Sequence, residues 1–443
     1  MRLTPSRLLF ATLVVASVLF FFLVSSVFFR ERGYDILTDR PAPAASRPSP
    51  PKVPLGETCS PFASGAMKDV TIIIKLGAPE VAFKLPAYLE RLTPCKPNLL
   101  LFSDRKDTIN KIPIIDALAN LRPEYKHNNP DFEIYNEIQK SNETPERTIE
   151  GWRLDKYKFL PMMEFTANER PDSQWYVFIE LDTYVNWDNL HRFLIRFNPT
   201  QPHYFGSPVW PKKKPVFAHG GSGFVLSHGA LRKLVARGRM FADNHISPGT
   251  HLFGKDVQKE CCGDEVLAKV LKECGVKLRG YWPNFNGERP SSMPFSREQW
   301  CEAIVTLHHL HEGDFDALHH WETLRQRPKT PFTFKELFGF MEDDMDERVD
   351  DWSNMSEDVT LKKGDAIKSF KGCFAACLKN SRCVQCEHAG DQCRLSYSIR
   401  LGHRQAREGN KRWTSGWVKD RIDAFRALQP QCEDGAHIVH PNP

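Results

Sequence analysis

Three short apolar runs, separated by segments with a helical pattern, constrain the fold of this chain more than any other feature. They are VTIIIKL (residues 70–76), NLLLFSD (98–104) and WYVFIEL (175–181), and turn-forming residues flank each one. Short runs without polar alternation are typical of strands that are buried on both faces of a sheet. Because helical segments alternate with these runs, the sequence predicts an α/β fold with a mostly parallel, open sheet.

We expect two further helices after the third run. One covers residues 188–197, and the other covers residues 264–274 and is followed by Gly275, a common helix stop. In open α/β sheets, ligands bind beyond the carboxyl ends of the strands. Polar residues that directly follow the predicted strands are therefore the first candidates for a functional site.

The N-terminal region predicts a membrane anchor. Residues 8–29 form a stretch of 22 residues without a charge, between Arg7 and Arg30. About 20 apolar residues cross a bilayer as a helix. A cleaved signal peptide is the alternative, but its apolar region is normally shorter, and no small-x-small cleavage site precedes Arg30. We expect a single-pass type II membrane protein with residues 1–7 in the cytosol.

Beyond the anchor, composition divides the chain into five segments. Residues 30–58 are rich in proline, which predicts an extended stem. The globular sequence of residues 59–340 would form the main domain. The acidic stretch in residues 341–355 is typical of a solvated linker. A cysteine-rich module at residues 356–420 and a tail at residues 421–443 complete the chain.

Cysteine content and glycosylation sequons agree with a lumenal location. The chain has 12 cysteines, a usage that suits an oxidising compartment. Asn142-Glu-Thr and Asn354-Met-Ser are acceptor sequons for N-glycosylation. The formal charge of +5 over 443 residues is modest, and no basic helix interleaves with aromatic residues. We therefore expect no nucleic-acid partner.

The strongest chemical signal is ELDTYV (residues 180–185), at the end of the third apolar run. Glu180 and Asp182 are two positions apart, so both carboxylates project to the same side of the chain. Such a pair can hold a hard cation that also binds a diphosphate. An acidic turn that merely closes the strand is the alternative.

WYVFIELDTYV is similar to the donor-binding stretch of glycosyltransferase family 31, which includes the Fringe and core 1 β1,3-galactosyltransferase enzymes. It most closely resembles the fungal branch. Four further blocks follow the family's order: GWRLDKYKFLP (151–161), HGGSGFVLS (219–227), CCGDEVLAKVL (261–271) and VTLHHL (305–310). In the family, three aspartates precede Thr-Tyr-Val, whereas Glu180 and Leu181 replace the first two here. The resemblance implies a glycosyltransferase-A-like, Rossmann-type mixed sheet and a UDP-sugar donor.

The resemblance also implies a divalent cation such as Mn²⁺ and assigns its ligands. Asp182 matches the third aspartate of the family's triplet, and His308 matches its late metal-binding histidine. A purely structural role is the alternative for His308, and His309 competes with it as a ligand. Glu180 would bind the metal, the ribose or a metal-bound water.

Asp264 matches the acidic residue that the family uses as the general base. Transfer with inversion needs one base, which takes the proton from the acceptor hydroxyl as it attacks the anomeric carbon. The metal would act as a Lewis acid on the departing diphosphate. Helix capping is the alternative role for Asp264, because helices favour aspartate at their start. Its neighbour Glu265 is a weaker candidate.

The HGGSG segment has two interpretations: a flexible turn, or a loop without side chains that lets a sugar or diphosphate approach the backbone. It lacks the ending of a nucleotide P-loop, and the chain has no Gly-x-Ser-x-Gly nucleophile elbow. Trp152 and Trp282 are candidates for pocket lining, although burial is the expected role of both. The predicted donor-binding residues are Lys156, Glu180, Asp182, Gly221, Ser222 and Gly223.

The cluster CFAACLKNSRCVQCEHAGDQCRLS resembles the PAN/Apple fold, a small disulfide-rich α+β domain that binds protein or carbohydrate. The resemblance implies that a helix is stapled to a hairpin by Cys373, Cys377, Cys383 and Cys393. Zinc is the competing interpretation, because Cys383-x-x-Cys386 has the spacing of zinc ligands. Cys386 lies outside the pattern, and Cys432 is a possible partner for it. We expect this module to be dispensable for chemistry.

Together with the predicted anchor, the resemblance implies a Golgi enzyme with a lumenal catalytic domain. It would transfer a hexose or N-acetylhexosamine from a UDP-sugar to a glycan or glycoprotein hydroxyl, with inversion and in a β1,3 linkage. The alternative is a non-catalytic membrane protein with a degenerate transferase fold that binds carbohydrate or protein. The altered aspartate triplet favours the alternative, whereas Asp182, Asp264 and His308 favour the enzyme.

Overall fold

The fold was obtained as a computed structural model. It describes residues 62, 65–92, 98–121, 123–140, 150–241, 254–325 and 330–432. The predicted cytosolic tail, anchor and stem, the Asn142 sequon and the end of the predicted C-terminal tail lie outside these residues. Among the residues that are described, no helix is long and apolar enough to cross a membrane.

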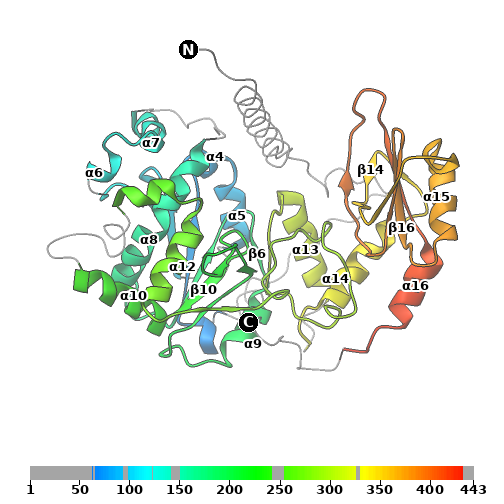
Figure 1. The fold of residues 1–443 in the computed structure, drawn as a ribbon. Coiled ribbons are helices and arrows are strands. Elements are labelled where there is room, and N and C mark those ends of the chain that lie inside the picture. The colour runs from blue at the N-terminus through cyan, green and yellow to red at the C-terminus, as the bar shows by residue number, and fades with distance from the viewer. Residues whose placement is uncertain are drawn as a thin grey trace, which may run out of the picture.

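The fold has a larger unit and a C-terminal unit. The larger unit is built around an eight-stranded mixed sheet with the strand order β11-β7-β10-β5-β1-β2-β4-β3 (Figure 1). Four of its seven pairings are parallel (β1–β2, β1–β5, β2–β4 and β7–β11), and three are antiparallel. The strands are β1 (Val70–Lys75), β2 (Asn98–Ser103), β3 (Asp107–Ile109), β4 (Ile112–Asp116), β5 (Trp175–Ile179), β7 (Tyr204–Gly206), β10 (Phe224–Ser227) and β11 (Leu278–Gly280). The three predicted strands are confirmed as β1, β2 and β5, and the mixed α/β fold is confirmed with them.

Helices cover both faces of the sheet, which explains why its central strands are apolar at nearly every position. One face carries Ile73 and Phe178 and packs against α8, α10 and α12. The other carries Ile74 and Val177 and packs against α5, α9, α13 and α14. The helices are α5 (Leu85–Leu92), α8 (Asp155–Glu169), α9 (Trp187–Leu194), α10 (His228–Phe241), α12 (Gly263–Glu273), α13 (Glu312–Leu324) and α14 (Phe334–Met341). The two helices predicted around residues 188–197 and 264–274 are α9 and α12.

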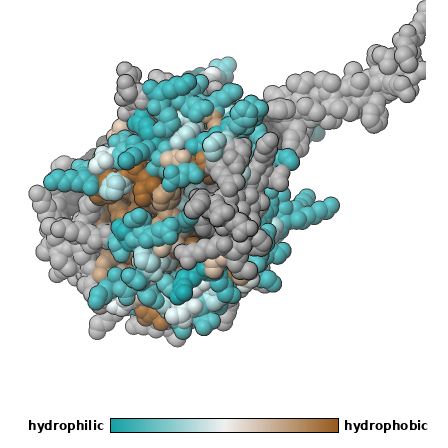
Figure 2. Space-filling model, turned by 90° about the vertical axis from the view of Figure 1, so that its left-hand side faces the viewer, coloured by the Kyte–Doolittle hydropathy of each residue, from teal (hydrophilic) through white to brown (hydrophobic). Residues whose placement is uncertain are grey.

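Figure 2 views the molecule from the side on which α6 (Pro123–Lys126) and α7 (Asp131–Lys140) lie in Figure 1. Hydrophilic residues cover most of the coloured surface, and hydrophobic residues gather in a hollow near its middle. The helices on this side therefore turn their polar positions outward, as expected of a layer that covers one face of a sheet.

The C-terminal unit is a five-stranded antiparallel sheet in the order β13-β19-β16-β17-β15, with α15 packed against it. Disulfides join Cys373 to Cys393 and Cys377 to Cys383, so Cys383 is not available as a zinc ligand. The elements are β13 (Val349–Asp350), β14 (Trp352–Ser353), β15 (Val359–Leu361), α15 (Phe370–Lys379), β16 (Gln385–Ala389), β17 (Gln392–Ser396), β18 (His403–Arg404), β19 (Trp413–Trp417) and α16 (Lys419–Ala427).

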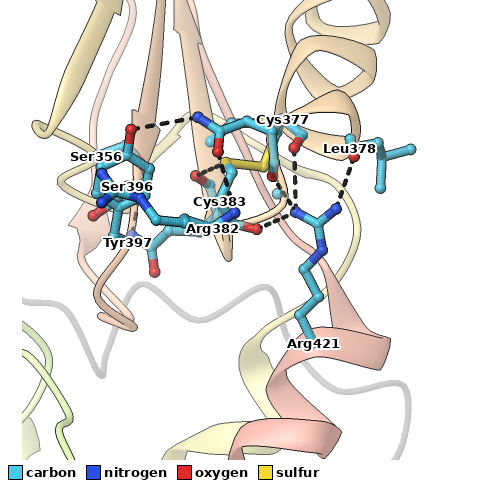
Figure 3. Close-up of a disulfide and its surroundings, with 12 residues drawn as sticks. Ser356, Cys377, Leu378, Arg382, Cys383, Ser396, Tyr397 and Arg421 are labelled. Carbon is cyan, nitrogen blue, oxygen red and sulfur yellow. Dashed lines mark hydrogen bonds between the residues drawn. A yellow bond between two sulfur atoms is a disulfide. The ribbon is translucent and has the colours of Figure 1, made fainter.

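The guanidinium of Arg421, on α16, closes the end of α15 beside one of these disulfides (Figure 3). It donates to the carbonyl oxygens of Leu378 and Asn380, both at 2.7 Å, and of Cys377 at 3.2 Å. The last carbonyls of a helix have no partner within the helix, and a cation there is favoured by the helix dipole. Arg421 therefore stabilises the loop that the Cys377–Cys383 disulfide closes.

Three predictions about this unit are wrong. The acidic segment 341–355 is not a solvated linker, because it contributes strands β13 and β14 and the buried Trp352. Asn354 is fully buried and donates to the carbonyl oxygen of Cys386 at 3.1 Å, so no glycan can be attached to it in the folded protein. Cys432 pairs with Cys301 of the larger unit, while Cys386 stays a buried free thiol.

The two units share one apolar core. Trp352 and Leu401 belong to the same buried cluster as the residues on one face of the large sheet. Trp300 of the larger unit lies edge-on to Phe425 of α16, with ring centroids 5.6 Å apart. Together with the Cys301–Cys432 disulfide, these contacts make the C-terminal unit part of the packing of the whole chain rather than a detachable module.

Candidate functional site

The predicted site residues other than Lys156 meet near the carboxyl ends of β1 and β5. Glu180 directly follows β5, and the turn after it is fixed by Thr183. The Thr183 hydroxyl accepts the backbone N–H of Glu180 at 3.1 Å and donates to the carbonyl oxygen of Gly221 at 2.7 Å. This hydrogen bond joins the turn of residues 180–183 to the glycine-rich loop, residues 219–223 (HGGSG). Two motifs that lie about forty residues apart in the sequence therefore form one site.

Asp182 lies beside two consecutive histidines. The Nε2 atom of His308 is 3.3 Å from Asp182 Oδ1, and the Nδ1 atom of His309 is 3.9 Å from Asp182 Oδ2. One ligand atom from each residue lies within 4.8 Å of the other two. The histidines follow β12 (Thr306–Leu307), which pairs antiparallel with β6 (Tyr184–Val185). A carboxylate oxygen and imidazole nitrogens are ligands that fit a divalent transition metal such as Mn²⁺.

The charges of Asp182 and His308 stabilise each other. Burial raises the pKa of Asp182, but the hydrogen bond and charge of His308 outweigh burial and hold that pKa well below its usual range. Burial lowers the pKa of His308, but Asp182 and then Glu180 outweigh it, so the pKa ends above its usual value. Burial, with the charges of His308 and His309, lowers the pKa of His219 to about 4. The Asp182 carboxylate is therefore ionised at neutral pH, as a metal ligand must be.

Glu180 is held by a lysine rather than by the histidines. Its Oε1 atom is 3.1 Å from the Nζ atom of Lys75, which is also 2.6 Å from Asp155. Burial raises the pKa of Glu180, and the Lys75 charge offsets only part of this effect. A line of alternating charges continues from Asp155 through Lys158 to Asp104, with contacts of 3.0 and 2.9 Å.

The sequence motifs do not predict this buried line of charges, although one residue gives a weak signal for it. Lys75 is the only charged residue of β1, a strand whose six positions are all buried. A lysine that ends such a strand needs a carboxylate partner, because an unpaired buried charge is costly. The identity of the partner depends on strand order, which places β5 beside β1.

Lys156, a predicted donor-binding residue, is not brought to this cluster. Its Nζ atom is 3.0 Å from Asp131 and donates to the carbonyl oxygen of Gln258 at 2.9 Å. Its neighbours Asp155 and Lys158 face the site instead. Successive residues of an α-helix point about 100° apart, so a shift of one or two positions changes the surroundings of the side chain completely.

The glycine-rich loop makes room for the catalytic candidates. A Cβ atom at Gly221 would lie 2.2 Å from two atoms of the His308 ring, and one at Gly220 would lie 3.4 Å from Asp264 Oδ2. Gly223 has a φ of +73°, which favours glycine. Ser222 is fully buried, and its hydroxyl lies 2.7 Å from Nδ1 of His219. Because Gly220 and Gly221 have no side chains, Asp264 and His308 can pack closely against their backbone.

Asp264 faces this loop from the start of α12. The N-cap of α12 is Cys262, so Asp264 lies inside the first turn rather than at the cap. Its Oδ2 atom accepts the N–H of Gly220 at 2.9 Å, and its Oδ1 atom accepts the N–H of Glu265 at 2.8 Å. Burial raises the pKa of Asp264, and these backbone hydrogen bonds only partly oppose the rise. The carboxylate is held rigidly and is more basic than an ordinary aspartate.

Glu265 has different surroundings. It is buried and ion-paired with Lys214 at 3.0 Å and Lys269 at 2.9 Å. Burial raises the pKa of Glu265, but the two lysines outweigh burial and bring it below the usual value. A carboxylate that is neutralised by two lysines is a poor proton acceptor, so the environment favours Asp264 over Glu265 as a base.

The two tryptophans that were expected to be buried are exposed. Trp152 is 63% exposed and Trp282 is 39% exposed. Trp152 lies in the short helix Gly151–Leu154, and Trp282 comes two residues after the end of β11.

The region that holds most of this site is similar to known proteins. Residues 135–279 match the Fringe-like family model, and they include Glu180, Asp182, the glycine-rich loop and Asp264. A stretch of 64 residues is 39% identical to glycoprotein-N-acetylgalactosamine 3-beta-galactosyltransferase 1 of Xenopus laevis. It covers 14% of this chain and 18% of that protein, so the match spans less than a fifth of the relative's length. Both comparisons support a glycosyltransferase.

Proposed function

Because the chain contains a Fringe-like domain, we propose that it is an inverting, metal-dependent member of glycosyltransferase family 31 with a glycosyltransferase-A-like fold. It transfers a hexose or N-acetylhexosamine from a UDP-sugar to a hydroxyl of a glycan or glycoprotein and forms a β1,3 linkage. The observation that carries this proposal is the convergence of Asp182, His308 and Asp264 around the Gly220–Gly221 peptide.

Asp182 and His308 would hold a divalent cation such as Mn²⁺. Their oxygen and nitrogen donors fit such an ion, and the low pKa of Asp182 keeps its carboxylate ionised. When bound, the cation neutralises the diphosphate and assists its departure as a Lewis acid. Glu180 is paired with Lys75 and would bind the ribose hydroxyls of the donor.

Asp264 is the proposed general base. Its carboxylate takes the proton of the acceptor hydroxyl while the hydroxyl oxygen forms a bond to the anomeric carbon. The bond from that carbon to the UDP oxygen breaks on the opposite side, and UDP leaves with the electron pair, so the configuration inverts. Two backbone N–H groups fix the carboxylate, and burial makes it a stronger base at neutral pH.

The cellular setting is part of the same proposal. Residues 8–29 would anchor the protein in the Golgi membrane with the catalytic unit in the lumen. The C-terminal unit, which resembles a PAN/Apple domain in its cysteine pattern, would bind carbohydrate or protein. Support comes from the 22-residue uncharged stretch and from the two disulfides of that unit.

The test is donor turnover by the full-length chain, purified in detergent and supplied with Mn²⁺ and individual UDP-sugars. We expect slow release of UDP from one UDP-sugar without acceptor, loss of the release with a chelator, and its return with added Mn²⁺. Asp182→Asn should abolish the release, whereas Asp107→Asn, at a strand on the far edge of the sheet, should not. Absence of turnover with every UDP-sugar by the folded protein would favour the non-catalytic alternative.

A further inference from the structure

His309 occupies an unusual position beside Asp182. The pairing of β6 with β12 sets Thr306 opposite Val185 and Leu307 opposite Tyr184. The ladder ends at these two pairs, and His309 follows two residues later. The N–H of Leu310 donates to the carbonyl oxygen of Asp182 at 3.1 Å, whereas an unchanged register would give that bond to the N–H of His309, so the backbone shifts by one residue at His309.

Two consecutive side chains of a regular strand point to opposite faces, so they cannot both reach one carboxylate. Here they do, because each ring faces a different oxygen: His308 Nε2 faces Oδ1 at 3.3 Å, and His309 Nδ1 faces Oδ2 at 3.9 Å. The two ring centroids are only 3.8 Å apart.

The backbone conformation of His309 makes this arrangement possible. Its φ is +60°, in the left-handed region that side-chain-bearing residues rarely adopt. Hydrogen bonds on both sides hold it there: Arg289 Nε donates to the carbonyl oxygen of His309 at 2.8 Å, and the next residue binds the backbone of Asp182. Strained conformations that their surroundings hold in place are concentrated at functional sites.

The two histidines differ in accessibility. His308 is buried, whereas the side chain of His309 is 50% exposed. The cluster is therefore closed on the side of His308 and open to solvent on the side of His309, so that an ion could enter and a diphosphate could reach it.

We propose that His309 is a second imidazole ligand, so that one carboxylate and two histidines hold the metal. This inference rests on the metal dependence in the proposed function. Two nitrogen donors favour borderline cations over Mg²⁺, which prefers oxygen ligands. Among first-row ions, the site should then bind Co²⁺ and Zn²⁺ more tightly than Mn²⁺, following the general order of affinity for nitrogen-containing sites.

Equilibrium metal binding by the full-length chain, without any UDP-sugar, tests the inference. Bound Mn²⁺ is measured from the loss of the EPR signal of free Mn²⁺, and Co²⁺, Zn²⁺ and Mg²⁺ are measured by competition with it. His309→Asn is the decisive variant, because asparagine tolerates the left-handed conformation but removes the imidazole. His309→Ala tests the same ligand without the polar group, and His127→Ala is a control at an exposed histidine.

We expect both His309 variants to bind Mn²⁺ at least about tenfold more weakly, the scale known for groups that support metal ligands, with an even larger loss for Co²⁺ and Zn²⁺. His127→Ala should bind all ions like the wild type. If folded His309→Asn binds Mn²⁺ and Co²⁺ as the wild type does, His309 is not a ligand, although the proposed function stands. If the wild type itself binds no divalent cation, the metal dependence of the proposed function fails and the inference fails with it.

Discussion

Replacement of Asp264 by asparagine separates catalysis from structure better than any other change at this site. The side chain keeps its size but loses the ability to accept a proton. A positioned general base contributes about 10²–10⁴-fold to rate, or about 3 to 5 kcal/mol of transition-state stabilisation. We expect sugar transfer to fall by that factor while the Kd for the donor changes little.

The structure also predicts a cost in stability. Each carboxylate oxygen of Asp264 accepts one backbone N–H, from Gly220 and from Glu265. Asparagine has one acceptor oxygen, so one of these N–H groups would face the amide NH₂ group instead. A buried donor without a partner costs about 1–3 kcal/mol. Removal of a buried charge offsets part of this cost, because the raised pKa of Asp264 shows that its ionised form is disfavoured.

Two measurements on the same preparation distinguish these effects: initial rates of transfer with saturating donor, and thermal unfolding by circular dichroism. Glu265→Gln is the matched control, since it changes the neighbouring carboxylate that is paired with Lys214 and Lys269. The control should retain transfer within a few-fold. Near-normal transfer by folded Asp264→Asn would refute the assignment of the base and return the search to Glu265.

Four further predictions follow from particular contacts. Gly221→Ala places a methyl group 2.2 Å from the His308 ring and should weaken Mn²⁺ binding at least about tenfold in the EPR assay. Gly339→Ala is its control, because the added Cβ meets nothing within 4 Å beyond its chain neighbours and the backbone of its own helix, and it should be neutral or stabilising by up to about 1 kcal/mol. Lys75→Met leaves two carboxylates without their shared cation and should lower the free energy of unfolding in urea by about 3–5 kcal/mol; an unchanged midpoint would refute the pairing. Because a base must be ionised to act and burial raises the pKa of Asp264, kcat should decline with falling pH at values above the ordinary aspartate range, and the residual rate of the asparagine variant should lack that decline. A chain ending at residue 347 should aggregate or be inactive, since it lacks the partners of the shared core; a soluble, active truncation would show that the two units fold independently.

The parts of the fold that the sequence predicts are those fixed by local pattern. β1 and β5 are buried at every position and β2 is buried at its last four, so their apolar runs identify them directly. The amphipathic period and the following glycine identify α12. Strand order, by contrast, leaves no local pattern, and the pairing of Lys75 with Glu180 depends on β1 lying beside β5.

The errors arise where tertiary packing decides the outcome. Lys156 and Lys158 are two positions apart on α8. Which of them faces the site depends on how the helix is rotated about its axis when it packs on the sheet, and here Lys158 does. A sequon specifies an asparagine but not its exposure, and Asn354 is buried by strands that come later in the chain. The Cys301–Cys432 disulfide joins residues 131 positions apart, a pairing that spacing could not reveal.

The central claim is inverting transfer at the Asp182–His308–Asp264 site, and the anomeric configuration of the product tests it most directly. The full-length chain is incubated with Mn²⁺, the UDP-sugar that it turns over, and a panel of glycan acceptors, and the product is analysed by NMR. The sugar of a UDP donor is α-linked, so a single base acting with inversion predicts a β-anomer, with a one-to-three linkage. An α-linked product, or the same product at an undiminished rate from Asp264→Asn, would contradict the account.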